Sequence, residues 1–376
     1  MTPYFTLCPD YRPENVDAAL KRLLAPWGGM EAFVKPGRKV LIKPNLLAAE
    51  AVEKRVTTDP ALVRAAASLA LAAGGRVSIG DSPALDSFAK TARRSGLAQV
   101  AEELGVPLLE LNQPCRVAVP RGGRFRHLDL ARQVVEAEVI INLPKLKTHS
   151  QMVLTLGVKN MFGAVVAQRK AQWHHQAGHD VTAFAGMLLD VWRTAKPALT
   201  ILDGVWGMEG QGPANGRARK FGLLGAARDS LIMDLNLALM LGLNWRRYPL
   251  AQAAAGLGLI PDPLPAPVWL GPAPGPDVFA AVDIPVQRRL GFLPGFLEGI
   301  VRRYVVCRPE QNPNRCLLCL KCLQMCPEKC IEERGGRLKF NYYKCIRCYC
   351  CQEVCPADAI RLRPGFLEKT LKALGR

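Results

Sequence analysis

The residues with the clearest chemistry are cysteines near the end of the 376-residue chain. The pattern Cys-x2-Cys-x2-Cys-x3-Cys-Pro begins at Cys316 and recurs 29 residues later, from Cys345. Three closely spaced thiolates can wrap one iron–sulfur cube, and the cysteine before the proline reaches across to the other cube. This rule predicts two ligand sets. They are Cys316, Cys319, Cys322 and Cys355 for one cube, and Cys326, Cys345, Cys348 and Cys351 for the other.

Zinc is the competing metal. Its sites usually combine two CxxC pairs across a longer spacer, without the third cysteine or the Cys-Pro ending. Residues 312–362 resemble bacterial two-[4Fe-4S] ferredoxin domains, with all eight ligand positions filled. The resemblance implies two [4Fe-4S] clusters. The other cysteines are expected to be small, buried, apolar side chains; they are Cys8, Cys115, Cys307, Cys330 and Cys350.

Charge and cysteine content indicate the surroundings of the protein. The formal net charge of +18 favours anionic partners, although no block of five Lys or Arg occurs and a solvated basic surface explains much of it. We see no signal-peptide pattern and no run of about 20 apolar residues that could span a bilayer. The lack of both patterns, together with the thirteen cysteines, predicts a cytoplasmic, oxygen-sensitive iron–sulfur protein without a transmembrane segment.

Strand and helix signals alternate through the first 260 residues. Strands are expected at 39–45, 76–83, 107–111, 137–149 and 198–216, and helices at 57–75, 86–104, 180–194 and 229–243. The alternation predicts an α/β fold, a parallel sheet with flanking helices. A small α+β ferredoxin-like domain follows it. The expected divisions are an α/β domain at 1–285, a connector at 286–310, the ferredoxin-like domain at 311–364 and a basic tail at 365–376.

Polar residues follow several of the predicted strands, where ligands of open α/β sheets bind. We expect one anion site there, although each lysine alone could simply face solvent. Its predicted members are Lys43, Asn45, Asp81, Ser82, Lys145, Lys147, Lys159 and Asn160. His149 could act as a general acid or base, and Asp203 or Glu209 could orient a donor. A cleft lysine contributes little to the core, so we expect Lys145→Ala to leave the fold intact.

Three histidines lie close together at His174, His175 and His179. His175 and His179 have the i, i+4 spacing of helical metal ligands. However, Gly178 intervenes, and no glutamate follows the first histidine as zinc proteases require. The pattern favours a mobile active-site loop over a metal site.

Five short motifs resemble the domain of unknown function 362 family. They are KPNLL (43–47), GDSP (80–83), INLPKLKTH (141–149), GVKNMFG (157–163) and DGVWGMEGQGP (203–213). The resemblance covers about residues 1–240, and many members of that family also end in a ferredoxin domain. The resemblance implies that the motifs form one site, but it indicates neither a substrate nor a reaction.

Two functions from different classes remain open. The first is an oxidoreductase that passes electrons through the clusters to or from a small anionic substrate or cofactor at the lysine-lined strand ends. The second is a non-catalytic electron carrier or scaffold that docks on an acidic redox partner. Nucleic-acid binding ranks third, because no aromatic stacking platform accompanies the basic charge. A short separation between the lysines and the cysteine ligands would favour the enzyme.

Overall fold

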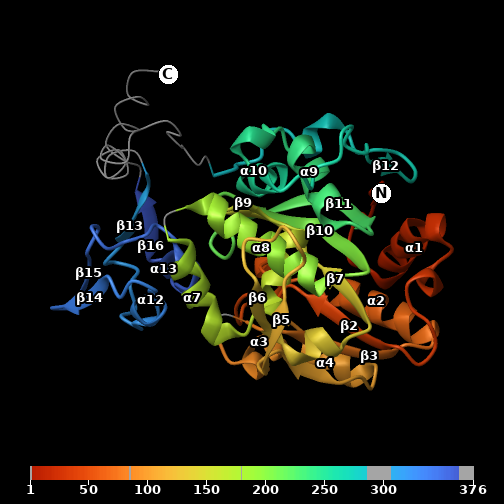
Figure 1. Cartoon of the computed structure of the whole chain (residues 1–376), viewed down its shortest axis with the longest axis horizontal. Coiled ribbons are helices and arrows are strands. Elements are labelled where there is room, and N and C mark those ends of the chain that lie inside the picture. The colour runs from red at the N-terminus through yellow and green to blue at the C-terminus, as the bar shows by residue number, and fades with distance from the viewer. Residues whose placement is uncertain (1, 84–85, 179, 286–305, 364–376) are drawn as a thin grey trace.

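A ten-stranded sheet forms the centre of the N-terminal unit (residues 2–285) in a computed structural model (Figure 1). The model describes residues 2–83, 86–178, 180–285 and 306–363. The strand order is β12-β1-β11-β10-β7-β2-β3-β4, and β8 and β9 extend the sheet beside β10. The bounds are β1 (Tyr4–Leu7), β2 (Lys39–Pro44), β3 (Arg76–Asp81), β4 (Leu108–Glu110), β7 (Val139–Leu143), β8 (Lys145–His149), β9 (Val153–Thr155), β10 (Leu199–Glu209), β11 (Arg217–Ala227) and β12 (Val268–Trp269).

The central strands confirm the predicted parallel sheet. Strands β10, β7, β2, β3 and β4 pair in parallel, whereas β11 runs antiparallel to both β10 and β1. A separate hairpin is formed by β5 (Pro114–Ala118) and β6 (His127–Ala131). The sheet is therefore mixed at one side and parallel through its centre.

Helices cover both faces of the sheet, because successive strand residues point to opposite sides. Val40 and Ile42 belong to one hydrophobic core and Leu41 to the other. The first of these cores packs against α1, α2 and α4, and the second against α6, α8, α9 and α10. The helix bounds are α1 (Pro13–Leu24), α2 (Pro60–Ala72), α3 (Phe88–Arg94), α4 (Leu97–Glu103), α5 (Arg132–Glu136), α6 (Gly157–Asn160), α7 (Ala167–Ala177), α8 (Val181–Ala195), α9 (Ser230–Met240) and α10 (Pro249–Gly256).

Three predicted elements differ from the structure. The helix expected at 86–104 is divided into α3 and α4 at Ser95 and Gly96, where Gly96 has a φ of +75°. The strand expected at 137–149 is divided at Pro144 into β7 and β8, because the long strand β10 pairs first with β7 and then with β8. The predicted histidine loop is wrong at His174 and His175, which lie in helix α7.

The internal repeat of cysteines is also a repeat of backbone structure in the C-terminal unit (residues 306–363). Helix α12 (Lys321–Gln324) recurs as α13 (Cys350–Glu353), and β14 (Ile331–Arg334) recurs as β16 (Ile360–Arg363). Left-handed residues recur at the same interval: Leu318, Leu320 and Lys329 correspond to Arg347, Tyr349 and Asp358. Two further strands, β13 (Arg308–Gln311) and β15 (Arg337–Phe340), complete a small α+β unit, as predicted.

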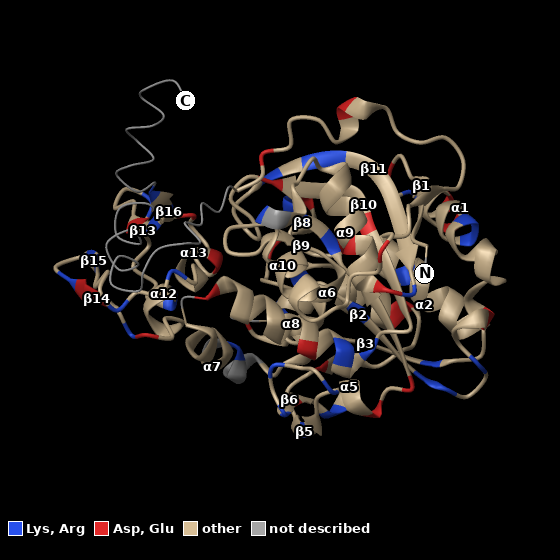
Figure 2. Cartoon of the chain, turned by 45° about the horizontal axis from the view of Figure 1, so that its top comes forward, with Lys and Arg blue, Asp and Glu red and all other residues tan. Residues whose placement is uncertain are grey.

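The C-terminal unit lies beside α7 and touches the N-terminal unit through α12 and α13 (Figure 1). Lys and Arg occur over both units (Figure 2). Most of the predicted connector (286–310) and all of the predicted basic tail (365–376) lie outside the described residues. Among the helices that the model describes, none is long and apolar enough to cross a membrane.

Candidate functional site

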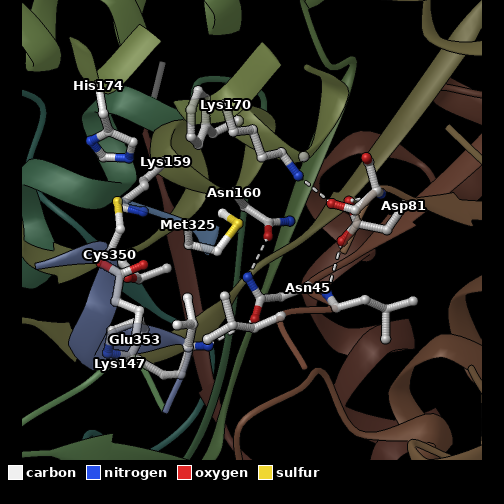
Figure 3. A pocket seen from close by; sticks show the side chains of 18 residues that line it. Asn45, Asp81, Lys147, Lys159, Asn160, Lys170, His174, Met325, Cys350 and Glu353 are labelled. Atoms are coloured by element: carbon white, nitrogen blue, oxygen red, sulfur yellow. Dashed lines mark hydrogen bonds between the residues drawn. The ribbon is translucent and has the colours of Figure 1, made fainter. Parts of the chain in front are cut away.

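A cavity of about 760 Å³, counting its open mouth, lies where the two units meet (Figure 3). The N-terminal unit supplies lysines, amides and carboxylates from the ends of β2, β3 and β8 and from α6 and α7. The C-terminal unit supplies Met325, which follows α12, two residues of α13 and Val354, which follows α13. The lining residues are Asn45, Leu46, Leu47, Asp81, Ser82, Lys147, Thr155, Lys159, Asn160, Phe162, Gly163, Lys170, His174, Pro213, Met325, Cys350, Glu353 and Val354.

A chain of side-chain amides holds the middle of the cavity wall. Lys147 Nζ donates to Asn45 Oδ1 at 2.8 Å, and Asn45 Nδ2 donates to Asn160 Oδ1 at 2.9 Å. Asn160 Nδ2 then donates to Asn142 Oδ1 at 2.7 Å. Each amide is oriented by its neighbours, so residues from β2, β7, β8 and α6 are fixed relative to one another.

A buried ion pair forms the base of another wall. Lys43 Nζ lies 2.8 Å from Asp81 Oδ1, and Asp81 Oδ2 accepts the backbone N–H of Leu46 at 2.8 Å. A Cβ atom at Gly163 would collide with both Asp81 Oδ1 and Lys43 Nζ. The glycine of the GVKNMFG motif therefore allows α6 and the turn after it to approach the pair closely.

Three polar groups that line the cavity have no hydrogen-bond partner among the described residues. They are Thr155 Oγ1, His174 Nδ1 and Glu353 Oε1. Thr155 and His174 are buried, and the His174 ring stacks on Phe184 with a centroid distance of 4.2 Å. Buried polar groups are normally hydrogen-bonded, so these three mark a place suited to a polar ligand.

The cavity has a cationic electrostatic character. Burial, followed by repulsion from Lys159 and Lys145, lowers the pKa of Lys147 to about 7. Burial likewise lowers the pKa of Lys170 to about 8, and the Lys170 ammonium donates to the Ser82 carbonyl. An anion between these lysines would stabilise their charged forms.

Glu353 brings a carboxylate from the C-terminal unit to this cationic wall. Its Oε1 lies 3.0 Å from Nε2 of the buried His149. Burial would raise the pKa of Glu353, but His149, Lys159 and His174 lower it to about 2. His149 Nδ1 accepts the backbone N–H groups of Gln151 and Met152, so the ring proton belongs on Nε2, facing Glu353.

The cavity brings together most of the residues predicted for the anion site. Asn45, Asp81, Ser82, Lys147, Lys159 and Asn160 line it. Lys43 lies behind it, paired with Asp81. That any of these residues binds a ligand stays a prediction.

Lys145 and Asp203 belong to a separate buried cluster. Lys145 Nζ donates to Asp203 Oδ2 at 2.8 Å and to the Tyr11 hydroxyl at 2.7 Å. The Tyr11 hydroxyl donates to Asp203 Oδ1 at 2.6 Å, and the backbone N–H of Asp59 donates to Asp203 Oδ2. Lys145 and Asp203 are fully buried. The premise that Lys145 lies at a cleft is therefore wrong, because β8 carries it into the sheet beside β10.

The two other predicted catalytic residues do not line the cavity. Glu209 ends β10 and pairs with Arg217 at 3.3 Å and Arg219 at 3.0 Å. His149 reaches the cavity only through Glu353. Both positions suit residues that hold local structure, and their predicted roles in proton transfer stay predictions.

Several lining residues had no signal in the sequence. Lys170 and Glu353 lie in helices where a single charged residue usually faces solvent. His174 was noticed only as part of a histidine group, and His175 instead contacts Glu328 of the C-terminal unit at 2.6 Å. No three His, Cys, Asp or Glu residues in the described ranges are grouped to hold a metal ion.

Four cysteines of the C-terminal unit face the same space. Cys326, Cys345, Cys348 and Cys351 line one small cavity. They are the four cysteines predicted for the second cluster, and thiolates are the donors that a [4Fe-4S] cube needs. That each predicted set of four cysteines holds a cube stays a prediction.

Backbone N–H groups also point at two of the predicted ligand sulfurs, in the same way in each repeat. Cys330 N donates to Cys326 Sγ at 3.3 Å, and Ala359 N donates to Cys355 Sγ at 3.1 Å. Such bonds raise the reduction potential of a cluster. The buried Cys330 thus occupies the position of Ala359, as its small side chain predicted.

Comparison with known proteins assigns the chain to a family. Residues 40–238 match the domain of unknown function DUF362, and residues 308–356 match a 4Fe-4S dicluster domain. The chain belongs to the DUF362 family and is an iron–sulfur electron-transfer protein. A thylakoid-associated protein of Synechocystis sp. is 40% identical over 258 residues, which cover 67% of this chain and 78% of that protein.

Two solved structures match part of the chain. One is the lactate racemase apoprotein of Thermoanaerobacterium thermosaccharolyticum, with 11% identity and a TM-score of 0.36 over 53% of this chain and 50% of that one. The other is a Thermotoga maritima protein with 11% identity and a TM-score of 0.34, over 54% and 51%. The chain thus spans about half the length of the solved structures that it matches.

Proposed function

We propose that the protein is an oxidoreductase that moves electrons between two [4Fe-4S] clusters and a small anionic substrate or cofactor in the cavity. One observation carries the proposal: the lysine-lined cavity has a wall made by Cys350 and Glu353. Cys350 is the neighbour of Cys351, a predicted ligand. A ligand held by the lysines would therefore lie close to the second cluster, as electron transfer requires.

The polar groups of the cavity suggest how such a ligand is held. Lys147, Lys159 and Lys170 would bind carboxylate or phosphate as point charges. Thr155 and His174 would complete its hydrogen bonds. Burial lowers the pKa of His174 to about 3, so its ring is neutral near pH 7 and can accept a hydrogen bond or a proton at Nδ1. The clusters, when bound, supply the electrons.

Anion binding next to the clusters tests this proposal. We would reconstitute the protein anaerobically, reduce it, and follow the paramagnetic resonance spectrum during titration with sulfate or acetate, as stand-ins for phosphate and carboxylate groups. The spectrum of one cluster should change with saturation, and Lys159→Ala should weaken binding about 10-fold, the scale of one charge-assisted hydrogen bond. Lys21→Ala removes an exposed lysine of α1 and serves as the control. Equal binding by both variants would contradict the proposed site.

A non-catalytic electron carrier is the second candidate, favoured by the exposure of the first cysteine loop. Leu317 and Leu318 are exposed, at 71% and 40%, and the predicted ligand Cys319 is exposed as well. A redox partner that docks there would approach the first cluster. Failure of every small anion to bind, with electron exchange retained, would favour this function.

We also propose that the protein works in the cytoplasm and loses its clusters in oxygen. The thylakoid association of its relative makes a membrane surface the main alternative. Anaerobic cell fractionation, with the protein detected by an antibody, distinguishes the cytoplasm from the membrane surface. A peripheral membrane protein would sediment with membranes at low salt and leave them at high salt. Iron analysis before and after exposure to air tests the oxygen sensitivity.

A further inference from the structure

Each cysteine loop carries one cation, at a different position of the repeat. Lys321 of the first loop corresponds to Cys350, and its charge is compensated by Asp86, 3.0 Å away. Leu318 in the first loop and Arg347 in the second are related by the 29-residue repeat, and both have left-handed φ values, +49° and +57°. Leu318 is 40% exposed, whereas Arg347 is 7% exposed. The second loop therefore buries a permanent positive charge where the first loop has a leucine.

The Arg347 guanidinium is incompletely paired by the protein. It stacks over the Tyr342 ring, with Cζ 5.0 Å from the ring centroid. Its Nε and Nη1 atoms are buried without a hydrogen-bond partner among the described residues. A guanidinium removed from water needs a compensating negative charge, because its desolvation costs several kcal/mol.

The predicted second cluster is the candidate for that compensation. In the chain, Arg347 lies between two predicted ligands of this cluster, Cys345 and Cys348. Both cysteines line the same small cavity. A [4Fe-4S]²⁺ cube with four thiolates carries a charge of −2, which matches a buried cation.

We propose that Arg347 sets the reduction potential of the cluster held by Cys326, Cys345, Cys348 and Cys351. Reduction adds one negative charge to that cluster, and an adjacent buried cation stabilises the reduced form more than the oxidised form. Arg347 therefore raises this potential above the value that a neutral residue at position 347 would give. Its charge favours an electron on the second cluster, whose loop lies beside the cavity.

This inference goes beyond the proposed function and does not depend on it, because an electron carrier would need the same asymmetry. Other charges near the second loop, such as Lys159 and Glu353, also influence the potential. They remain constant when only residue 347 is changed. A purely structural role of Arg347 would alter iron content but not the potential of a fully loaded protein.

The test is an anaerobic redox titration followed by paramagnetic resonance. We would compare wild type with Arg347→Gln, which keeps the side-chain size but removes the charge, and with Arg347→Lys, which retains a charge. Iron is measured in each sample. Arg347→Gln should lower the midpoint potential of one cluster and leave the other nearly unchanged, and Arg347→Lys should have a smaller effect.

The internal repeat offers the reverse variant. Leu318→Arg places the charge in the first loop and should raise the potential of the other cluster. Unchanged potentials in a fully loaded Arg347→Gln protein, or equal shifts of both clusters, would overturn the proposal. If Arg347→Gln fails to retain iron, Leu318→Arg decides, and an unchanged potential there would also overturn it.

Discussion

The buried lysines Lys145 and Lys147 have different surroundings, so we expect their removal to have different effects. Lys145 is neutralised by Asp203 inside the sheet, so Lys145→Ala leaves a buried, unpaired carboxylate. We expect a loss of about 3–5 kcal/mol of stability, the usual cost of breaking a buried ion pair from one side. Thermal unfolding followed by circular dichroism measures it. The double variant with Lys145→Met and Asp203→Leu should recover much of the loss, and an unchanged melting temperature for Lys145→Ala would contradict this account.

Lys147 makes anion binding depend on pH. Its pKa in the free protein is lowered to about 7 by burial and by Lys159, and a bound anion would raise it. Below pH 7 the lysine is already protonated and affinity is constant. Above pH 7, binding must take up a proton, so affinity for sulfate should fall by up to about 10-fold per pH unit. Calorimetry in two buffers of different ionisation enthalpy reports the proton uptake. Lys147→Met should remove the dependence between pH 7 and 8, whereas above pH 8 the loss of the proton of Lys170 would still weaken binding. Constant affinity of wild type from pH 6 to 9 would argue against both.

At the scale of elements, the sequence predicted what local patterns determine. The alternation of apolar strands and amphipathic helices predicted the parallel centre of the sheet, and the helix expected at 57–75 is α2, which follows its N-cap Asp59. The pairing of β8 with β10 could not be predicted, because a parallel register depends on contacts 58 residues apart, such as Asp203 with Lys145. That pairing is what removes Lys145 from the site.

The candidate site was predictable only in part, for the same reason. Asn45, Lys147 and Asn160 follow apolar strands or lie in short motifs, so their position had a local signal. Glu353 and Cys350 reach the cavity through the docking of α13, which nothing near them in the chain indicates.

Helix α13 is held by Gln352, which predicts how the two units come apart. Its side chain accepts from Ser150 Oγ at 3.0 Å and donates to the Gln211 carbonyl at 3.1 Å. We expect Gln352→Ala to weaken this contact by about 1–3 kcal/mol, the scale of two buried hydrogen bonds. Hydrogen exchange should then accelerate in α13 and in β8. Gln324→Ala, which removes an exposed glutamine of α12, is the control. Equal rates of hydrogen exchange in α13 and β8 of the two variants would refute this role of Gln352.

At the scale of the whole molecule, the crossed ligands predict coupling between the repeats. Cys326→Ala should impair the cluster held mainly by the second loop, and Cys355→Ala the cluster held mainly by the first. Each variant should retain about four of eight iron atoms, counted per chain by iron and sulfide analysis. The paramagnetic resonance spectra of the two variants, added together, should reproduce the wild-type spectrum. Stoichiometric zinc in place of iron would exclude the assignment altogether.

The two units together make a site that neither makes alone. The N-terminal unit supplies the lysines and amides, and the C-terminal unit supplies Glu353 and the neighbour of a cluster ligand. The proposed transfer of electrons to a bound anion requires this arrangement.

Mass spectrometry of the small molecules bound to anaerobically purified protein tests whether an anion binds at the junction of the two units. We would compare wild type with Lys159→Ala and Lys21→Ala, each shown to contain the same iron. We expect an anionic compound to be bound to wild type and to Lys21→Ala, and to be absent from Lys159→Ala. No bound anion in any sample, or the same amount in all three, would contradict a ligand site at the junction of the two units.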